Sequence, residues 1–96
     1  MLVLITYDVN TTTADGRRRL RSVAKRCVAH GTRVQNSVFE CVLDNTQLKV
    51  LMHELEQTID TKYDSLRFYL LGNNYQNRVV HVGAKETMEV EGELIL

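Results

Sequence analysis

The sequence predicts a small α+β domain in which two helices cover one face of an antiparallel sheet. Three observations support this class: an apolar run opens the chain, two later segments have helical apolar spacing, and short strand-like runs lie between and after them. The chain has 96 residues, which predicts one domain over residues 1–96. A core of this size is modest, so association with a second copy would add useful burial.

A strand and a helix form the predicted first half. Residues 2–9 are a nearly continuous apolar run, which is typical of a central strand. A polar, threonine-rich stretch follows over 10–16. From Arg17 the apolar residues take helical spacing, at Leu20, Val23, Ala24, Cys27 and Val28. Asp15 suits the cap or first turn of this helix, and Gly31 suits its end.

The middle of the chain predicts a pair of short strands and a second helix. Residues 33–43 are rich in strand formers, but their alternation slips at Asn36 and Ser37. This slip indicates a tight reversal or a bulge. Residues 44–46 then suit the cap of a helix whose apolar positions are Leu48, Leu51, Met52, Leu55 and Ile59.

The last third predicts further strands. Residues 66–71 indicate a strand, 72–77 a turn, and 79–82 a returning strand. A short apolar run over 94–96 follows an acidic stretch. The resulting order is β-α-β-β-α-β with one or two extra strands, which is the ferredoxin-like arrangement with an added C-terminal strand.

The charge of the chain is balanced overall but unevenly distributed. There are 12 basic and 12 acidic residues. Half of the basic residues nevertheless lie close together, at Arg17, Arg18, Arg19, Arg21, Lys25 and Arg26. A patch of this density suits contacts with phosphates, and a solvated helix face explains it equally well.

The cysteine spacing and the hydropathy argue against a cysteine metal site, a membrane-spanning segment and a secretory signal. Cys27 and Cys41 lack the close Cys or His spacing of a metal site, which indicates buried free thiols in a reducing cytosol. No run approaches the roughly 20 apolar residues that span a bilayer. Met1 leads directly into the first apolar run, so we expect no secretory signal and a cytoplasmic location.

Asp8 is the best candidate for a metal ligand. It ends the first predicted strand, where side chains become accessible, and a carboxylate is a suitable ligand for Mg²⁺ or Mn²⁺. From spacing alone, an ordinary strand-end aspartate is the simpler explanation. One carboxylate is also too few to hold Mg²⁺ well, although a two-fold dimer would bring a second Asp8 to the same axis. Tyr7 and Phe39 could flank such a site or belong to the core, and Arg33 could line a groove or face water.

Four segments resemble a known family. LVLITYDV at 2–9, GRRRLRSVAKRC at 16–27, RVQNSVFEC at 33–41 and YLLGNN at 69–74 are similar to the small CRISPR-associated nucleases of the spacer-acquisition module, the family called Cas-two. The likeness covers nearly the whole chain and is closest to type I members, subtype I-C. The Tyr-Asp pair of the first strand and the RVQxSVFE pattern are specific in combination.

The resemblance implies a ferredoxin-like homodimer that holds Mg²⁺, or Mn²⁺, between two copies of Asp8. It also implies that residues 94–96 cross to extend the partner's sheet. Family members are metal-dependent endonucleases on double-stranded DNA or single-stranded RNA, and they also bridge the complex that inserts new spacers. The positions that match residues implicated in family activity are Tyr7, Asp8, Arg17, Arg19, Arg33 and Phe39.

Two functions from different classes follow. In a phosphodiesterase, a metal at Asp8 would polarise the scissile phosphate and activate water, while arginines neutralise flanking phosphates. In a DNA-binding scaffold, the basic helices of two protomers would position duplex DNA, and the chemistry would belong to a partner integrase subunit.

Overall fold

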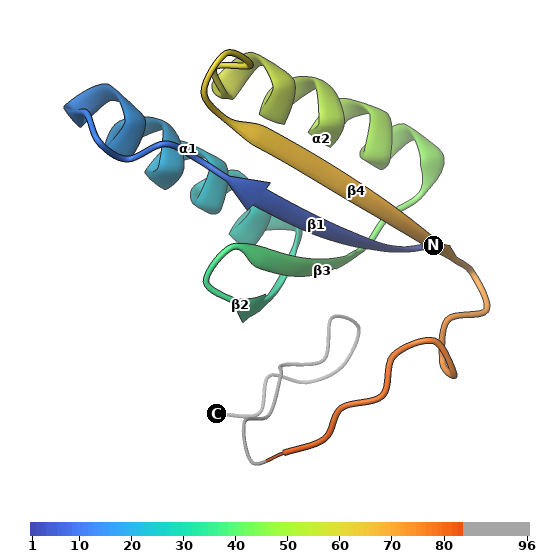
Figure 1. The fold of residues 1–96 in the computed structure, drawn as a ribbon. Helices are drawn as coiled ribbons and strands as arrows, with labels where there is room; N and C mark the ends of the chain where they lie inside the picture. Colours follow the sequence, from blue (N-terminus) through green and yellow to red (C-terminus); the bar gives the residue numbers. More distant parts are fainter. Residues whose placement is uncertain (84–96) are drawn as a thin grey trace.

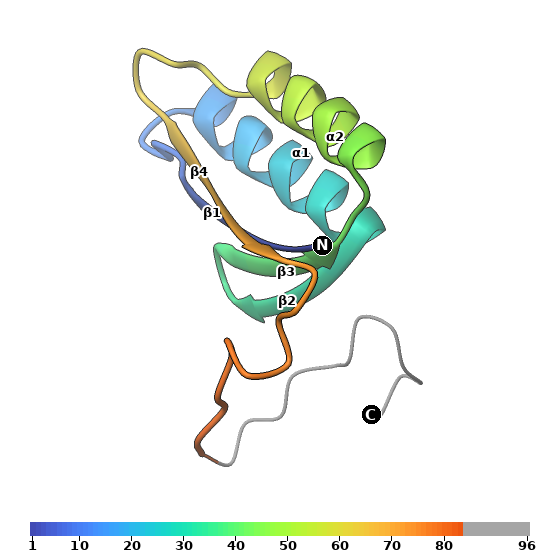
Figure 2. The same ribbon diagram turned by 90° about the vertical axis from the view of Figure 1, so that its right-hand side faces the viewer.

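The computed structural model describes residues 1–83 as a four-stranded antiparallel sheet with two helices on one face (Figures 1 and 2). The strands lie in the order β2-β3-β1-β4. This is the predicted ferredoxin-like arrangement. In chain order the elements are β1 (Leu2–Asp8), α1 (Ala14–His30), β2 (Gly31–Gln35), β3 (Val38–Val42), α2 (Asn45–Thr58) and β4 (Ser65–Gly72).

Both ends of α1 follow from local chemistry. The Thr13 side chain caps the helix by accepting a hydrogen bond from the Gly16 amide at 3.0 Å, and Asp15 lies in the first turn. At the other end, the Gly31 amide donates to the carbonyl of Cys27. A Cβ at Gly31 would collide with β3 at Cys41, so glycine lets the chain pass directly from α1 into β2.

The β2–β3 connection contains both features that the slip in alternation predicts. The chain reverses at Asn36 and Ser37, and the register also shifts between Arg33 and Gln35. The cap of α2 follows as predicted. The Asp44 carboxylate accepts from the Gln47 amide at 2.7 Å, and the Gln47 side chain accepts from the Asp44 amide at 2.9 Å.

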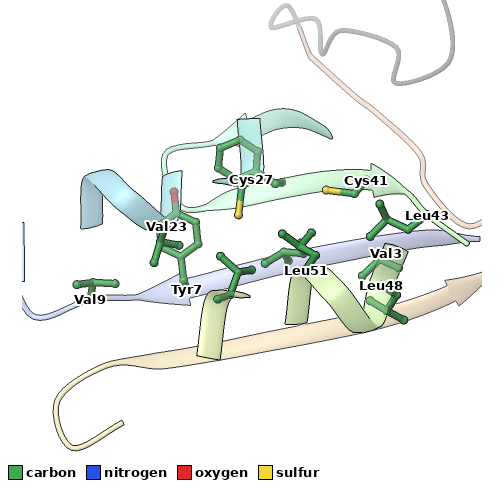
Figure 3. Packing of buried hydrophobic residues seen from close by; sticks show 12 residues of the cluster. Val3, Tyr7, Val9, Val23, Cys27, Cys41, Leu43, Leu48 and Leu51 are labelled. Carbon is green, nitrogen blue, oxygen red and sulfur yellow. The ribbon is translucent and has the colours of Figure 1, made fainter. Parts of the chain in front are cut away.

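The core lies between the sheet and the two helices. Alternate residues of β1 point into it, and Figure 3 shows Val3 and Tyr7 among side chains from α1, α2 and β3. Cys27 and Cys41 are buried free thiols there, as predicted. Burial raises their pKa to about 12 and about 11, so both stay protonated and unreactive at neutral pH. The buried cluster comprises Val3, Ile5, Tyr7, Val9, Val23, Cys27, Phe39, Cys41, Leu43, Leu48, Leu51 and Leu55.

The predicted strand over residues 79–82 is wrong. The chain leaves β4 at Gly72, whose φ of 80° favours glycine, and residues 79–82 pair with no strand within the described part of the chain (Figure 1). Val80 and Val82 are 81% and 88% exposed. Apolar β-branched residues form a strand only beside a partner edge, and sequence alone could not supply that condition. The predicted strand over 94–96 lies outside the described residues.

Candidate functional site

Asp8 lies at the free end of β1, on the sheet face opposite the helices. Its partner across the ladder is Ser65, the first residue of β4. Both side chains are exposed. Together with Thr6 and Arg67 they line an open hollow at this end of the sheet. The predicted metal ligand is therefore accessible to solvent and to a phosphate.

Arg67 is a site residue that the sequence reasoning missed. It pairs across the ladder with Thr6, so its side chain shares the outer face with Asp8. Its Nη1 donates a hydrogen bond to the Tyr69 hydroxyl at 3.1 Å, and its guanidinium lies 6.0 Å from the centre of the Tyr69 ring. Strand alternation was the available signal, because Ser65, Arg67 and Tyr69 must share one face of a strand.

Tyr7, Phe39 and Arg33 form a stack on the inner face. The rings of Tyr7 and Phe39 are 6.1 Å apart at 21°, and the Arg33 guanidinium lies 5.1 Å from the centre of the Phe39 ring. The Tyr7 hydroxyl donates to the Asn36 carbonyl at 3.2 Å, so the stack also ties β1 to the β2–β3 turn. Burial raises the pKa of Tyr7, and the neighbouring Cys27 adds to the shift.

Asp8, Tyr7, Arg33 and Phe39 are the predicted catalytic residues, and the structure brings the last three together but separates them from Asp8. Asp8 is exposed on the outer face, whereas Phe39 is 0% exposed and Tyr7 is 6% exposed within the core. Phe39 has no surface with which to touch a substrate. Any contribution of Tyr7 and Phe39 to activity has to pass through the shape of β1 and the position of the exposed Arg33. Their assignment as catalytic residues stays a prediction.

Arg19 is engaged within the protein. Its Nε and Nη2 donate to the Asp64 carboxylate at 2.7 and 3.3 Å, and the Arg19 side chain is only 20% exposed. The same carboxylate accepts from the backbone amides of Asn10 at 3.0 Å and Asp60 at 2.9 Å. Asp64 therefore joins the loop after β1, helix α1 and the loop before β4.

The pKa of Asp64 reflects this arrangement. Burial alone would raise it, but the hydrogen bonds from Arg19, Asp60 and Asn10 outweigh burial and hold the pKa below its ordinary value. Asp64 stays ionised and holds together the loop that follows Asp8 and the loop that leads into Ser65. Sequence reasoning missed this pair because Asp64 is far from Arg19 along the chain.

Four further basic residues of α1 are exposed, namely Arg17, Arg18, Arg21 and Lys25, whereas Arg26 is only partly exposed and its Nε is buried without a hydrogen-bond partner among residues 1–83. Arg18 pairs with Asp15 at 2.9 Å, but both side chains are largely exposed, so the pair is weak. The Arg17 Nη1 donates to the Thr11 carbonyl. Arg21 and Lys25 are exposed and form no ion pair with any residue in 1–83. Arg21 and Lys25 are therefore accessible, and the role of the basic cluster in binding phosphates stays a prediction.

A single chain offers too few ligands for the predicted metal among its described residues. Within residues 1–83, no three His, Cys, Asp or Glu side chains gather into a possible metal-binding group. Asp8 offers one carboxylate, and Ser65 beside it offers a hydroxyl. Mg²⁺ accepts such a set when waters and substrate oxygens complete six ligands, and a second carboxylate from another copy would strengthen the site.

Comparison with known proteins decides the family. Residues 1–79 match the family described as CRISPR associated protein Cas2. A relative from Chlorobaculum tepidum, named CRISPR-associated endoribonuclease Cas2, is 59% identical over 96 residues and covers all of both chains. This chain belongs to the Cas2 family. The predicted family is confirmed, and subtype I-C stays a prediction.

Other Cas2 proteins agree in sequence and in structure. CRISPR-associated endonuclease Cas2 of Halalkalibacterium halodurans is 58% identical over 95 residues, covering 99% of each chain. The crystal structure of Streptococcus pyogenes Cas2 at pH 6.5 matches with a TM-score of 0.75 and 59% identity, covering 86% of this chain and 100% of that one. The ferredoxin-like fold is thus shared within the Cas2 family. No helix among residues 1–83 has both the length and the apolar character needed to cross a membrane.

Proposed function

We propose that this Cas2 chain is a divalent-metal-dependent endonuclease that takes part in CRISPR spacer acquisition. It acts as a cytoplasmic homodimer on double-stranded DNA or single-stranded RNA. The observation that carries the proposal is the exposed Asp8 carboxylate at the end of β1, with Arg67 in the same open hollow. The names of its close relatives, an endonuclease and an endoribonuclease, support the reaction class.

Asp8 of both protomers would hold Mg²⁺ or Mn²⁺. A divalent cation in such a site lowers the pKa of a bound water and offsets charge on the phosphate. Arg67 binds a non-bridging phosphate oxygen with its guanidinium, which Tyr69 already orients. The Arg33–Phe39–Tyr7 stack holds Tyr7, the neighbour of Asp8 in β1, and would thereby help to position the Asp8 end of the strand.

The test compares two aspartate-to-asparagine variants. Asp8→Asn removes the charge that binds the metal and keeps the size of the side chain. Asp44→Asn is the matched control, because Asp44 lies at the other end of the sheet and asparagine also caps helices well. We expect Asp8→Asn to lower the Mg²⁺-dependent cleavage rate by about a thousandfold or more while nucleic-acid binding is retained. Equal cleavage by wild type and Asp8→Asn would refute the nuclease proposal.

The second candidate function is a non-catalytic scaffold that positions duplex DNA for the CRISPR integrase subunit. The observation in its favour is the row of exposed cations on α1, of which Arg21 and Lys25 have no ion-pair partner within residues 1–83. Such contacts bind phosphates without reading sequence. If purified wild type binds DNA tightly but never cleaves DNA or RNA at any Mg²⁺ or Mn²⁺ concentration, the scaffold explains the family's role better.

A further inference from the structure

The pocket next to the Asp8 hollow carries the further inference. Two loops and the first part of α1 form it: the loop that follows β1 contributes Asn10 and Thr12, and the loop that precedes β4 contributes Asp60 and Tyr63. Its volume of about 370 Å³ is within the usual range for small-molecule sites. Tyr63 is a large aromatic side chain at the rim and is 60% exposed. We propose that this pocket binds one unpaired nucleobase of the substrate, stacked on Tyr63.

The walls of the pocket are held in place. Asp64, the neighbour of Tyr63, binds the Asn10 amide across the two loops and Arg19 of α1. The Tyr63 amide itself donates to the Asp60 carbonyl at 3.0 Å, and the Asn10 side chain accepts from the Thr12 hydroxyl at 2.7 Å. A stacking platform on pre-ordered loops loses little entropy on binding, so this geometry favours recognition of a planar ring.

The position of the pocket relates it to the proposed reaction. Asn10 lies two residues beyond Asp8, and Tyr63 lies two residues before Ser65, which pairs with Asp8. Two residues of chain span at most about 7 Å, so the pocket and the hollow are neighbours at one end of the sheet. A strand with its phosphate at Asp8 can therefore place an adjacent base against Tyr63.

The charges of the pocket select a base over a phosphate. Asp15 and Asp60 contribute two carboxylates to its lining, of which Asp15 also pairs with the exposed Arg18, and the one basic residue in the lining, Arg19, is engaged with Asp64. Carboxylates repel a phosphate but accept hydrogen bonds from the amino and imino groups of a base. In a duplex, the hydrogen-bonding edge of a base is used by its partner base and its ring face by the neighbouring bases. The pocket therefore implies a substrate with an unpaired nucleotide beside the cleaved bond. This inference rests on the proposed nuclease function for one point, namely that the substrate strand lies with its phosphate at Asp8.

The experiment uses the fluorescent base 2-aminopurine, whose emission falls when it stacks. The probe is a duplex with a short single-stranded end that carries this base, and binding is measured without added metal so that no cleavage occurs. Wild type is compared with Tyr63→Phe, which keeps the ring, and Tyr63→Leu, which removes it. We expect quenching with wild type and Tyr63→Phe, whereas Tyr63→Leu leaves the emission high and binds the probe about tenfold more weakly. Binding of a blunt duplex should not change.

The outcomes separate this inference from the nuclease proposal. Quenching and affinity that are the same in Tyr63→Leu as in wild type would overturn the base pocket, even if cleavage still requires Asp8. Quenching that depends on the Tyr63 ring supports the pocket, even if wild type fails to cleave with Mg²⁺ and the nuclease proposal falls. Thermal unfolding of each variant checks folding, which a 60% exposed side chain should hardly affect.

Discussion

On the sheet face under the helices, β1 contributes Val3, Ile5 and Tyr7, which are at most 6% exposed. On the opposite face the same strand contributes Leu4, Thr6 and Asp8, which are partly or fully exposed. Consecutive residues of one strand thus belong to different environments, since side chains alternate across a sheet. Tyr7 and Asp8 are adjacent in sequence, yet the first is part of the core and the second faces solvent.

The two faces of the sheet should therefore respond differently to substitution. The inner face has a closed apolar core and a buried Asp64 clamp, so substitutions there should change stability. The outer face has open hollows and polar side chains, so substitutions there should change binding or cleavage.

Phe39→Ala tests the inner face. Phe39 is fully buried between Tyr7 and Arg33, so its truncation should lower the free energy of unfolding by about 3–5 kcal/mol. Tyr69→Ala is the matched outer-face variant, and because Tyr69 is 40% exposed it should cost only about 1 kcal/mol. Urea unfolding followed by circular dichroism measures both. A Tyr69→Ala loss that equals that of Phe39→Ala at a low protein concentration would contradict this difference between the two faces, whereas an added loss that appears only at higher concentration reports burial of the outer face by the second copy of the proposed dimer.

Asp64→Ala tests the clamp that joins the two loops beside the site. It leaves the backbone amides of Asn10 and Asp60 without their acceptor, which should cost about 2–3 kcal/mol of unfolding free energy. Asp15→Ala is the control, because its exposed pair with Arg18 contributes little. Equal stability of the two variants would show that the clamp does not hold the loops.

The clamp also predicts a dependence on pH. The pKa of Asp64 is lower in the folded protein than in the unfolded chain, so its contribution is fully present above about pH 4. That contribution is lost as pH falls through the folded pKa. Wild type should therefore lose stability in acid more steeply than Asp64→Asn, which cannot ionise. Parallel stability curves for the two proteins below about pH 4 would contradict this assignment.

The double variant Arg21→Glu/Lys25→Glu tests the exposed cations of α1. We expect binding of duplex DNA to weaken about tenfold or more, with a smaller dependence of affinity on salt. Lys49→Glu/Lys62→Glu makes the same change in net charge at exposed positions outside α1. If both double variants weaken binding equally, net charge rather than the α1 surface determines affinity.

Local signals made much of the fold predictable. Asp44 caps α2 and Gly31 ends α1 because each acts on its own neighbours in the chain. The slip at Asn36 and Ser37 likewise marks a reversal that depends on nearby residues. The strand expected over 79–82 failed because a strand needs a partner edge, and apolar residues alone do not provide one.

The candidate site was less predictable, since it depends on residues that are distant in sequence. Asp8 was predicted because it ends a strand and because its Tyr-Asp segment resembles the Cas2 family. Arg67 was missed because only the register of β1 against β4 brings it beside Asp8. The ion pair of Arg19 with Asp64 was missed for the same reason. In sequence, Arg19 cannot be distinguished from the other basic residues of the cluster, although it pairs with a buried carboxylate in the structure.

Titration of the purified protein with Mn²⁺, followed by electron paramagnetic resonance, shows whether two chains share one cation at Asp8. We expect one tightly bound cation for every two chains, because two Asp8 carboxylates share it across a two-fold axis. We also expect that Asp8→Asn abolishes this binding and that Asp44→Asn retains it. Tight binding that persists in Asp8→Asn, or one cation for every single chain, would contradict the shared site.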